Sequence, residues 1–406
     1  MREATRFVGR HSGAVAAVVA AGVLVLVAGA STCSRATAAV RWERAFYDAE
    51  QLHIDGQHDA ARQRFAALRA SAHRGQDADE AGLMACEAAR RGGETLAAAA
   101  CYDALGQDAT EREVRARALL HAAEIRVFEL ERQADGERLL WILVERATDT
   151  AAGQRALDHL YAMARDAPSR VDATVGRMLD LARAAPLSDL ADNLLIRTAM
   201  LLEARGGTAD LRTADEAMMA FERDHVGSPA RVAALMVHAR VLTRLDEPAR
   251  EAVVLEKVVG DWEASAVFGS YYVPDHSAAA LRLIALYRGR LADLERAESH
   301  LHHLVEMVEA QSGVFEVIAQ LADVQEQRGN LRAARATWRR LVQLAEKRDT
   351  ELRGFDARVC GEEARSEDRG RCSDATRTFA PLPVKEVARA QGEIARLGGL
   401  IAARRP

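Results

Sequence analysis

A cluster of histidines in residues 299–303 is the most obvious set of side chains that could bind a metal ion. His302 lies one helical turn before Glu306, and that spacing would let an imidazole and a carboxylate share one ion. However, Leu301 and Leu304 belong to the apolar stripe of the same helix, which leaves the histidines at its rim. We therefore favour a solvated histidine cluster over a metal site.

Two neighbouring tyrosines suggest a second candidate site, this time for contact with another molecule. Tyr271 and Tyr272 fall in the segment Gly269–His276, which reads GSYYVPDH and is longer than a usual connection between repeats. Exposed aromatic side chains on a loop can mark a contact surface. They can equally fasten the loop to its own protein, and the sequence leaves both alternatives open.

The sequence contains none of the common catalytic motifs. It has no Gly-rich phosphate loop, no GxSxG and no HExxH, so nucleotide, esterase and zinc-protease chemistry have no recognisable residues. The formal net charge is −5, which disfavours binding to nucleic acid. We therefore expect a protein that is not an enzyme, with no cofactor, no metal and no nucleic-acid partner.

Cysteine usage favours an oxidising compartment. Apart from Cys33, the cysteines fall in two nearby pairs: Cys86 with Cys101 on one predicted helical hairpin, and Cys360 with Cys372 around a polar stretch. Sequential disulfides are the natural expectation there, and closure of a loop of this size stabilises by about 3 kcal/mol. For Cys86 and Cys101, two buried thiols are the alternative. A zinc site is not expected, because no CxxC occurs.

Helical hairpins must position all of these residues, and the segment Phe315–Leu344 shows the hairpin pattern best. Its first helix has a stripe at i, i+3, i+4 and i+7, and its second helix has a facing stripe. Gly329 separates the two helices, because glycine takes the left-handed conformation at low cost. The stripe residues are Ile318, Leu321, Ala322 and Gln325, then Ala334, Trp338 and Leu341.

The same pattern recurs along the chain in more degraded form. Equivalent small residues are 37, 38 and 37 residues apart in the steps 61 to 98, 98 to 136 and 297 to 334, which allows about eight hairpins. Arg212 and Ala292 stand where a turn glycine would be expected. The recurring positions are Ala45, Ala49, Leu52, Gly56, Ala61, Phe65 and Leu68; Cys86, Gly93, Ala98, Tyr102 and Leu105; Ala123, Val127, Gly136, Leu140 and Leu143; Ala199, Ala217 and Phe221; Ala252; and Leu281, Ile284, Ala285, Ala297, Leu301 and Leu304.

This pattern resembles the tetratricopeptide repeat. The resemblance implies an all-α fold, an α-solenoid of about eight stacked hairpins that forms a superhelix with a concave groove. It further implies that outward residues of each first helix line this groove and bind protein or peptide partners. Matched to the two best late copies, the groove residues are Arg282, Arg290, Glu316, Asp323, Glu326 and Gln327.

The amino terminus predicts export. Three arginines among the first ten residues precede Gly13–Ala30, which is 18 uncharged and mostly apolar residues. The run could be a secretory signal that is cleaved after Ala30. It could end in a lipobox that resembles those of bacterial lipoproteins and leaves Cys33 as the lipid-bearing residue, although Thr32 departs from that pattern. It could also stay as a membrane anchor, since about 17 residues suffice to span a bilayer. All three alternatives place the repeats outside the cytoplasm of a bacterium.

We therefore expect four segments and a scaffold function. The junction Phe221–Pro229 resembles those of envelope lipoproteins of the outer-membrane-protein assembly and cell-division coordinator types, which implies a membrane-anchored, periplasm-facing protein that docks protein partners. The alternatives are an accessory subunit of an envelope glycan-processing or outer-membrane assembly machine, and a periplasmic chaperone. The segments are 1–33, a signal or anchor; 34–350, the repeat array; 351–380, a charged loop; and 381–406, with a capping helix at Val384–Ala403.

Overall fold

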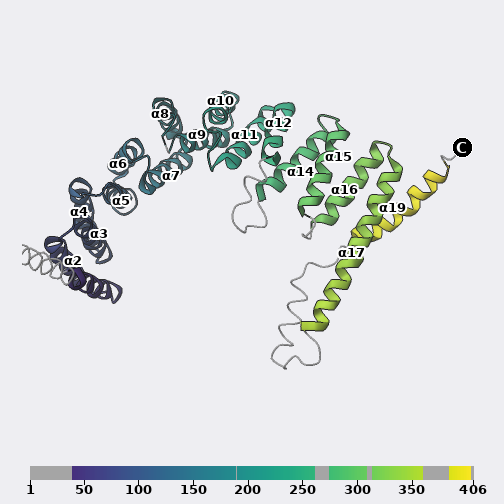
Figure 1. Cartoon of the computed structure of the whole chain (residues 1–406). Coiled ribbons are helices and arrows are strands. Elements are labelled where there is room, and N and C mark those ends of the chain that lie inside the picture. The colour runs from purple at the N-terminus through teal and green to yellow at the C-terminus, as the bar shows by residue number, and fades with distance from the viewer. Residues whose placement is uncertain (1–38, 189, 261–273, 309–312, 360–383, 404–406) are drawn as a thin grey trace, which may run out of the picture. The chain divides into compact units, whose positions relative to one another are not determined.

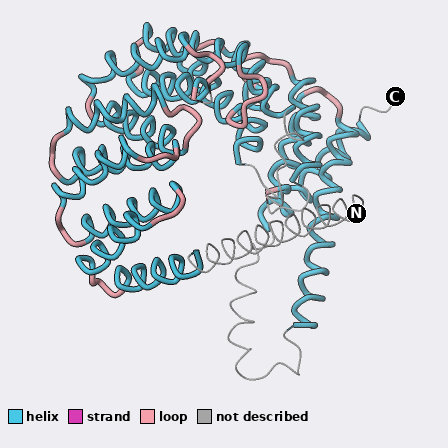
Figure 2. Tube along the Cα trace, turned by 60° about the vertical axis from the view of Figure 1, so that its left-hand side comes forward, coloured by secondary structure: helices cyan, strands magenta, loops and turns pink. Residues whose placement is uncertain are grey.

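The computed structural model describes residues 39–188, 190–260, 274–308, 313–359 and 384–403. Within these ranges the regular structure is entirely helical, with no strand (Figure 2). The chain divides into two compact units, residues 1–194 and 195–406. The expectation of an all-α fold is therefore confirmed for the described residues, and each unit is described by itself.

In the first unit, each helix packs against the next one along the chain (Figure 1). A helix over residues 39–54 comes first. The others are α2 (His58–Ser71), α3 (Gly75–Arg91), α4 (Thr95–Asp108), α5 (Arg112–Glu124), the π-helix η1 (Ile125–Glu129), α6 (Gln133–Arg146), α7 (Ala151–Asp166), the 3-10 turn η2 (Pro168–Arg170) and α8 (Val171–Ala184). Helix α9 (Ala191–Arg205) contains the boundary between the units.

Small residues let these helices approach one another closely. Ala61 and Ala98 are fully buried, and Phe65 and Tyr102 fill the space beside them. Gly136 of α6 shows one such close approach, because an added Cβ would lie 2.4 Å from Val127 Cγ2 in η1. The predicted alternation of small and bulky residues therefore forms the core of this unit.

The second unit continues with helices that also pack in chain order. One hydrophobic core extends from α11 to α19. The helices are α10 (Thr208–Asp224), α11 (Arg231–Leu245), α12 (Pro248–Gly260), α14 (Pro274–Arg288), α15 (Leu294–Val308), α16 (Val314–Gln327), α17 (Leu331–Val359) and α19 (Val384–Ala403).

The hairpin of α16 and α17 is the one that the sequence predicted in most detail. Both predicted stripes are buried, including the amide of Gln325 and the indole of Trp338. Gly329 has φ +80° and stands between the two helices, in the left-handed conformation that favours glycine. Burial of a stripe in every helix is what stabilises hairpins too short to be stable alone.

Three acidic side chains tie successive parts of the second unit together. Asp215 of α10 accepts hydrogen bonds from Arg250 of α12. The fully buried Glu251 accepts from Arg282 of α14 at 2.6 Å. The third is the buried Glu298 of α15, which pairs with Arg328 after α16 and accepts from Gln325 Nε2 at 3.0 Å. We refer to these three as the carboxylate clamps.

Two of the sequence predictions about individual residues were wrong. On α14, Leu281 and Ala285 are exposed and only Ile284 of the predicted stripe is buried, because the helix packs between α12 and α15 and buries a wider face that is rotated from the predicted one. Arg212 lies inside α10 and is no turn residue. The turn before that helix uses Gly206, with φ +79°.

The loop predictions also need correction. Helix α17 continues to Val359, so residues 351–359 are helical, and Lys347 lies 3.9 Å from Glu351 at i,i+4 spacing. The segment Gly269–His276 ends in helix, since α14 begins at Pro274 and His276 is buried.

Several expectations fall on residues outside the description. These are the first 38 residues, which include Gly13–Ala30 and Cys33, the tyrosines Tyr271 and Tyr272, and the pair Cys360 and Cys372. Of the helices that are described, none is both long and apolar enough to cross a membrane.

Candidate functional site

The predicted groove residues on α14 are engaged by their own chain. Arg282 Nε donates to the buried Glu251 at 2.6 Å, and Arg290 lies 2.8 Å from Asp246 at the end of α11. Their positive charge is therefore largely balanced before any partner arrives.

Helix α19 covers part of the predicted groove face of α16. Arg389 lies 2.8 Å from Asp323, and Arg396 lies 2.5 Å from Glu326. The other two predicted residues of this helix, Glu316 and Gln327, are exposed. The six predicted residues therefore do not form one open surface, because Asp323 and Glu326 form ion pairs with the C-terminal helix α19.

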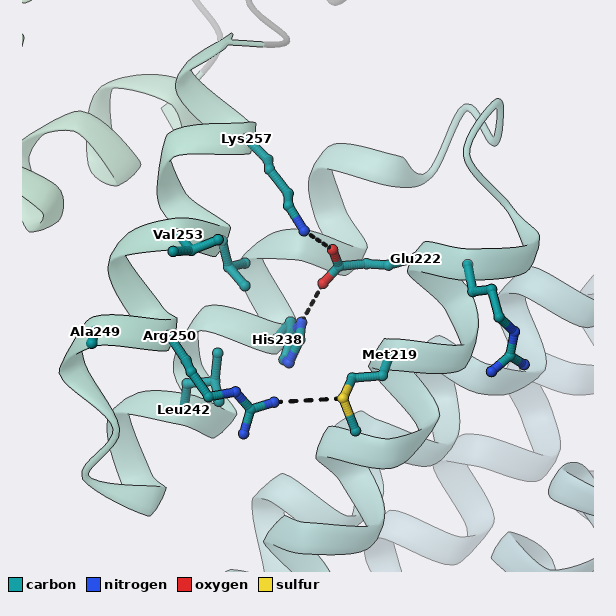
Figure 3. A pocket seen from close by; sticks show the side chains of 10 residues that line it. Met219, Glu222, His238, Leu242, Ala249, Arg250, Val253 and Lys257 are labelled. Carbon is teal, nitrogen blue, oxygen red and sulfur yellow. Dashed lines mark hydrogen bonds and ion pairs between the residues drawn. The ribbon is translucent and has the colours of Figure 1, made fainter.

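An open pocket of about 600 Å³ lies elsewhere, among α10, α11 and α12 (Figure 3). Sequence reasoning did not find it, and it shares no residue with the predicted groove. The lining residues are Met219, Glu222 and Arg223 of α10, His238 and Leu242 of α11, and Ala249, Arg250, Val253, Val254 and Lys257 of α12.

Helical spacing gives the pocket its polar and apolar sides. Arg250, Val253 and Lys257 stand at i, i+3 and i+7 on α12, so their side chains follow one face of that helix. Pro248 is the first residue of α12, where its fixed φ and missing N–H suit the start of a helix. Leu242 of α11 forms part of the buried floor.

His238 is held between two carboxylates at the base of the pocket. It is 3% exposed; its Nδ1 lies 2.5 Å from Glu222 Oε1 and its Nε2 lies 2.8 Å from Asp215 Oδ1. Each ring nitrogen of His238 therefore has a carboxylate oxygen as its hydrogen-bond partner. With neither nitrogen free, His238 cannot act as a general base, a nucleophile or a metal ligand in this arrangement.

The two carboxylates are held in turn by cations of α12. Arg250 Nη2 lies 2.7 Å from Asp215 Oδ1, and Lys257 Nζ donates to Glu222. Burial raises the pKa of Glu222, but hydrogen bonds from His238 and Lys257 outweigh it and lower that pKa to about 2. Glu222 is therefore ionised at any physiological pH.

Exposure differs sharply between the charges of this network. The side chains of Arg250 and Lys257 are each 42% exposed, whereas those of Asp215 and Glu222 are 11% and 15% exposed. Among the apolar residues of the pocket, Met219 is 45% and Val253 is 52% exposed. A molecule that enters the pocket thus meets cations and apolar side chains, with Asp215 and Glu222 behind them. Glu247, which also lies 2.6 Å from Arg250 and is 40% exposed, is not among the lining residues.

A weak signal for this pocket was present in the sequence. The cations Arg250 and Lys257 on α12 have the same seven-residue spacing as the acids Asp215 and Glu222 on α10. Equal spacing of opposite charges allows two helices to form two ion pairs when they lie side by side. The spacing predicts a site only once the two helices are known to be neighbours.

A second histidine cluster lies in the first unit. Glu124 accepts hydrogen bonds from His121 at 3.2 Å and from His159 at 3.0 Å. Burial raises the pKa of Glu124, but the two histidines lower it well below its usual range. The π-helix η1 follows directly, and Phe128 in it is exposed beside the His159 ring. This cluster joins α5 to α7.

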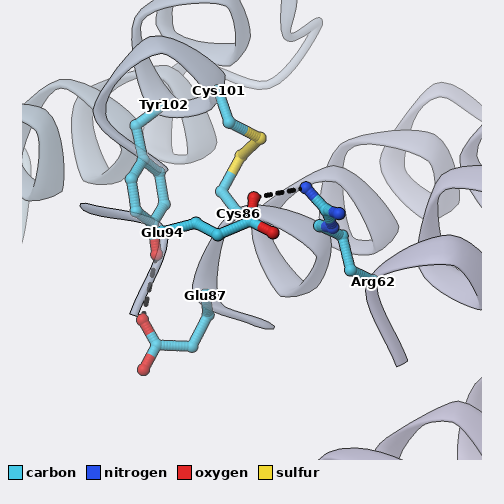
Figure 4. Close-up of a disulfide and its surroundings, with 6 residues drawn as sticks. All are labelled: Arg62, Cys86, Glu87, Glu94, Cys101 and Tyr102. Atoms are coloured by element: carbon cyan, nitrogen blue, oxygen red, sulfur yellow. Dashed lines mark hydrogen bonds and ion pairs between the residues drawn. A yellow bond between two sulfur atoms is a disulfide. The ribbon is translucent and has the colours of Figure 1, made fainter. Parts of the chain in front are cut away.

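The structure contains the disulfide between Cys86 and Cys101 (Figure 4). Their Cα atoms are 5.5 Å apart, and the bond joins α3 to α4 within one hairpin. Tyr102 Oη donates to Glu87 at 3.0 Å on the same hairpin. In contrast to these cross-links, no group of three or more His, Cys, Asp or Glu side chains that could hold a metal ion occurs in the described part of the chain.

Comparison with known proteins gives partial likenesses only. Neither a protein-family model nor a curated protein matches this chain. A chain in the structure of Naa15/Naa10 bound to HypK-THB is 17% identical with a TM-score of 0.37, over 84% of this chain and 51% of that one. BtubC from P. vanneervenii is 15% identical with a TM-score of 0.30, over 62% and 94%. A tetratricopeptide repeat protein from Parabacteroides merdae is 10% identical with a TM-score of 0.24, over 75% and 93%.

This chain therefore spans about half the length of the matched chain in the first of these structures. At such TM-scores the likenesses carry no argument about function. The assignment of packed helical hairpins rests on the helices and contacts of the chain itself.

Proposed function

We propose that this chain is a non-catalytic scaffold that docks protein or peptide partners, and that the pocket of α10, α11 and α12 is one docking point. The observation that carries the proposal is the combination of exposed Met219 and Val253 with an ion network whose imidazole has no free nitrogen. Such a pocket can bind apolar and charged groups but has no group ready for acid–base chemistry.

Photo-crosslinking at the pocket tests this proposal. A photoreactive amino acid replaces Val253 in the full chain, which is then irradiated in its native cells. Adducts are compared with those from the same amino acid at Leu187, an exposed apolar position outside the pocket. Protein adducts specific to position 253 are expected. Equal adducts at both positions would refute the docking role of the pocket.

We further propose that the scaffold faces the periplasm of a bacterium and is anchored by its amino terminus. Support comes from the apolar run Gly13–Ala30 after three arginines and from the Cys86–Cys101 disulfide, since disulfides persist in oxidising compartments. Partners would then be other proteins of the cell envelope. Mass spectrometry of the mature amino terminus separates a lipidated Cys33 from a retained anchor, and cytoplasmic fractionation would contradict both.

A further inference from the structure

We infer that the pocket of α10, α11 and α12 binds an acidic, aliphatic helix of a partner protein, in which two carboxylates flank a bulky aliphatic side chain. The inference rests on the proposed function, because it assumes that the pocket is a docking point. It names the chemistry of the partner at that point.

Charge complementarity is the first argument. Arg250, Lys257 and Arg223 are the cations of the pocket lining, and Arg223 forms an ion pair with the adjacent Asp224 at 2.6 Å. Lys257 pairs with Glu222, which is much less exposed, and Arg250 is shared between the sheltered Asp215 and Glu247, which is 40% exposed but does not line the pocket. The lining itself therefore holds three cations and one carboxylate, Glu222, although the network as a whole is balanced.

Spacing is the second argument. Arg250 and Lys257 are seven residues apart on one helix, which places them about 10 Å apart along its axis. Val253 and Val254 lie between them in the sequence and line the same pocket. A partner helix that runs alongside α12 matches this order with an acid at position i, aliphatic residues at i+3 and i+4, and a second acid at i+7.

The apolar part of the pocket suits an aliphatic side chain. Met219 and Val253 are exposed on its two sides, and Leu242 and Val254 are buried beneath them. Figure 3 shows Arg250 reaching toward Met219, and Arg250 Nη2 lies 3.6 Å from Met219 Sδ. The flexible thioether can adjust to side chains of different shape, and a pocket of about 600 Å³ has room for them.

Binding of a designed peptide to the full chain, purified in detergent, tests the inference. The probe is a fluorescein-labelled, Ala-rich helical peptide with Glu at i, Leu at i+3 and i+4, and Glu at i+7, and binding is followed by anisotropy. Replacing both Glu by Gln, or both Leu by Ala, should each weaken binding by about tenfold or more, and raising the salt concentration should weaken the parent peptide further. Equal affinity for the Gln peptide, or tighter binding of an Arg peptide, would overturn the inference.

Variants at one exposed position separate charge from packing. Val253→Asn removes the apolar contact, whereas Val253→Asp also adds a negative charge, so the Asp variant should bind the acidic peptide about tenfold more weakly than the Asn variant. Leu187→Asp is the control outside the pocket and should bind like the parent chain. Equal affinities of the two Val253 variants would contradict the acidic preference. Circular dichroism verifies that each variant is folded.

The two levels of proposal can fail separately. If crosslinking at position 253 captures a protein in cells but the acidic peptide does not bind, docking stands and the acidic, aliphatic chemistry is wrong. If neither is observed, the docking role of the pocket and the partner chemistry are both wrong.

Discussion

Arg389 of α19 clasps Asp323 of α16: its Nη2 lies 2.8 Å from Oδ1 and 2.9 Å from Oδ2, across 66 residues of sequence. The same guanidinium lies 5.1 Å from the centre of the Trp338 ring on α17. One side chain thus contacts both helices of the last hairpin. The C-terminal helix is held where a partner's helix would lie if this hairpin used the predicted groove face.

The attachment of α19 should depend more on its buried leucine than on its ion pairs. Leu397 is fully buried, so Leu397→Ala should cost about 2–5 kcal/mol. Asp323→Asn removes an exposed pair and should cost about 0.5 kcal/mol. Hydrogen exchange over residues 384–403 measures both, and faster exchange in the Asp323 variant than in the Leu397 variant would contradict this ranking.

Glu222 should make the stability of the second unit depend on pH. Its pKa in the folded chain is about 2, below its usual value of 4.5. The resulting stabilisation is complete above about pH 4.5 and is lost as the pH falls toward 2. Glu222→Gln should therefore destabilise by about 1–3 kcal/mol at pH 7 and by less at pH 3.

Urea unfolding of this variant at pH 7, 5 and 3 measures the difference. Glu216→Gln is the matched control, because Glu216 lies exposed on the same helix. The control should differ little from the parent chain at each pH. An effect of Glu222→Gln that stays constant with pH would argue against the low pKa.

Reduction of the Cys86–Cys101 disulfide should weaken the first unit. The bond closes a loop with a sequence separation of 15, and a loop of this size is stabilised by about 3 kcal/mol in the chain-entropy model. Thermal unfolding with and without reductant measures the loss. The Cys86→Ala, Cys101→Ala double variant should melt like the reduced chain and should show no further response to reductant.

Two glycines in the first unit should respond in opposite directions to the same substitution. An added Cβ at Gly136 would lie 2.4 Å from Val127 Cγ2 and 2.9 Å from the Ala123 carbonyl oxygen, whereas nothing lies within 4 Å of one at Gly176. Gly136→Ala should destabilise by about 1–3 kcal/mol. Gly176→Ala should stabilise by up to about 1 kcal/mol, because alanine favours the helix. Denaturant unfolding of both variants gives the signs.

The sequence predicted the fold best at positions where the residue type alone indicates the structural role, such as a turn glycine or a buried tryptophan. Gly329 is at a positive φ and Trp338 is fully buried, as the hairpin pattern required. The pattern failed on α14, where Leu281 is exposed, because helices on both sides widen the buried face and a single stripe no longer describes it.

The candidate site was less predictable because it depends on which helices are neighbours. The predicted groove residue Asp323 has a partner 66 residues away on α19, and no local spacing reveals such a contact. His238 was equally hidden, since its role depends on two acids from the preceding helix. Residue periodicity predicts which face of a helix is buried. A site also depends on which other helices pack against that face, and periodicity does not predict them.

The carboxylate clamps have a consequence for how this chain can change its length. Asp215, Glu251 and Glu298 each pair with an arginine that lies further along the chain: Arg250 of α12, Arg282 of α14 and Arg328 after α16. A deletion that removed one of these arginines but kept its sheltered acid would cost about 3–5 kcal/mol. Changes of length in this part of the chain are therefore expected to keep each acid together with an arginine.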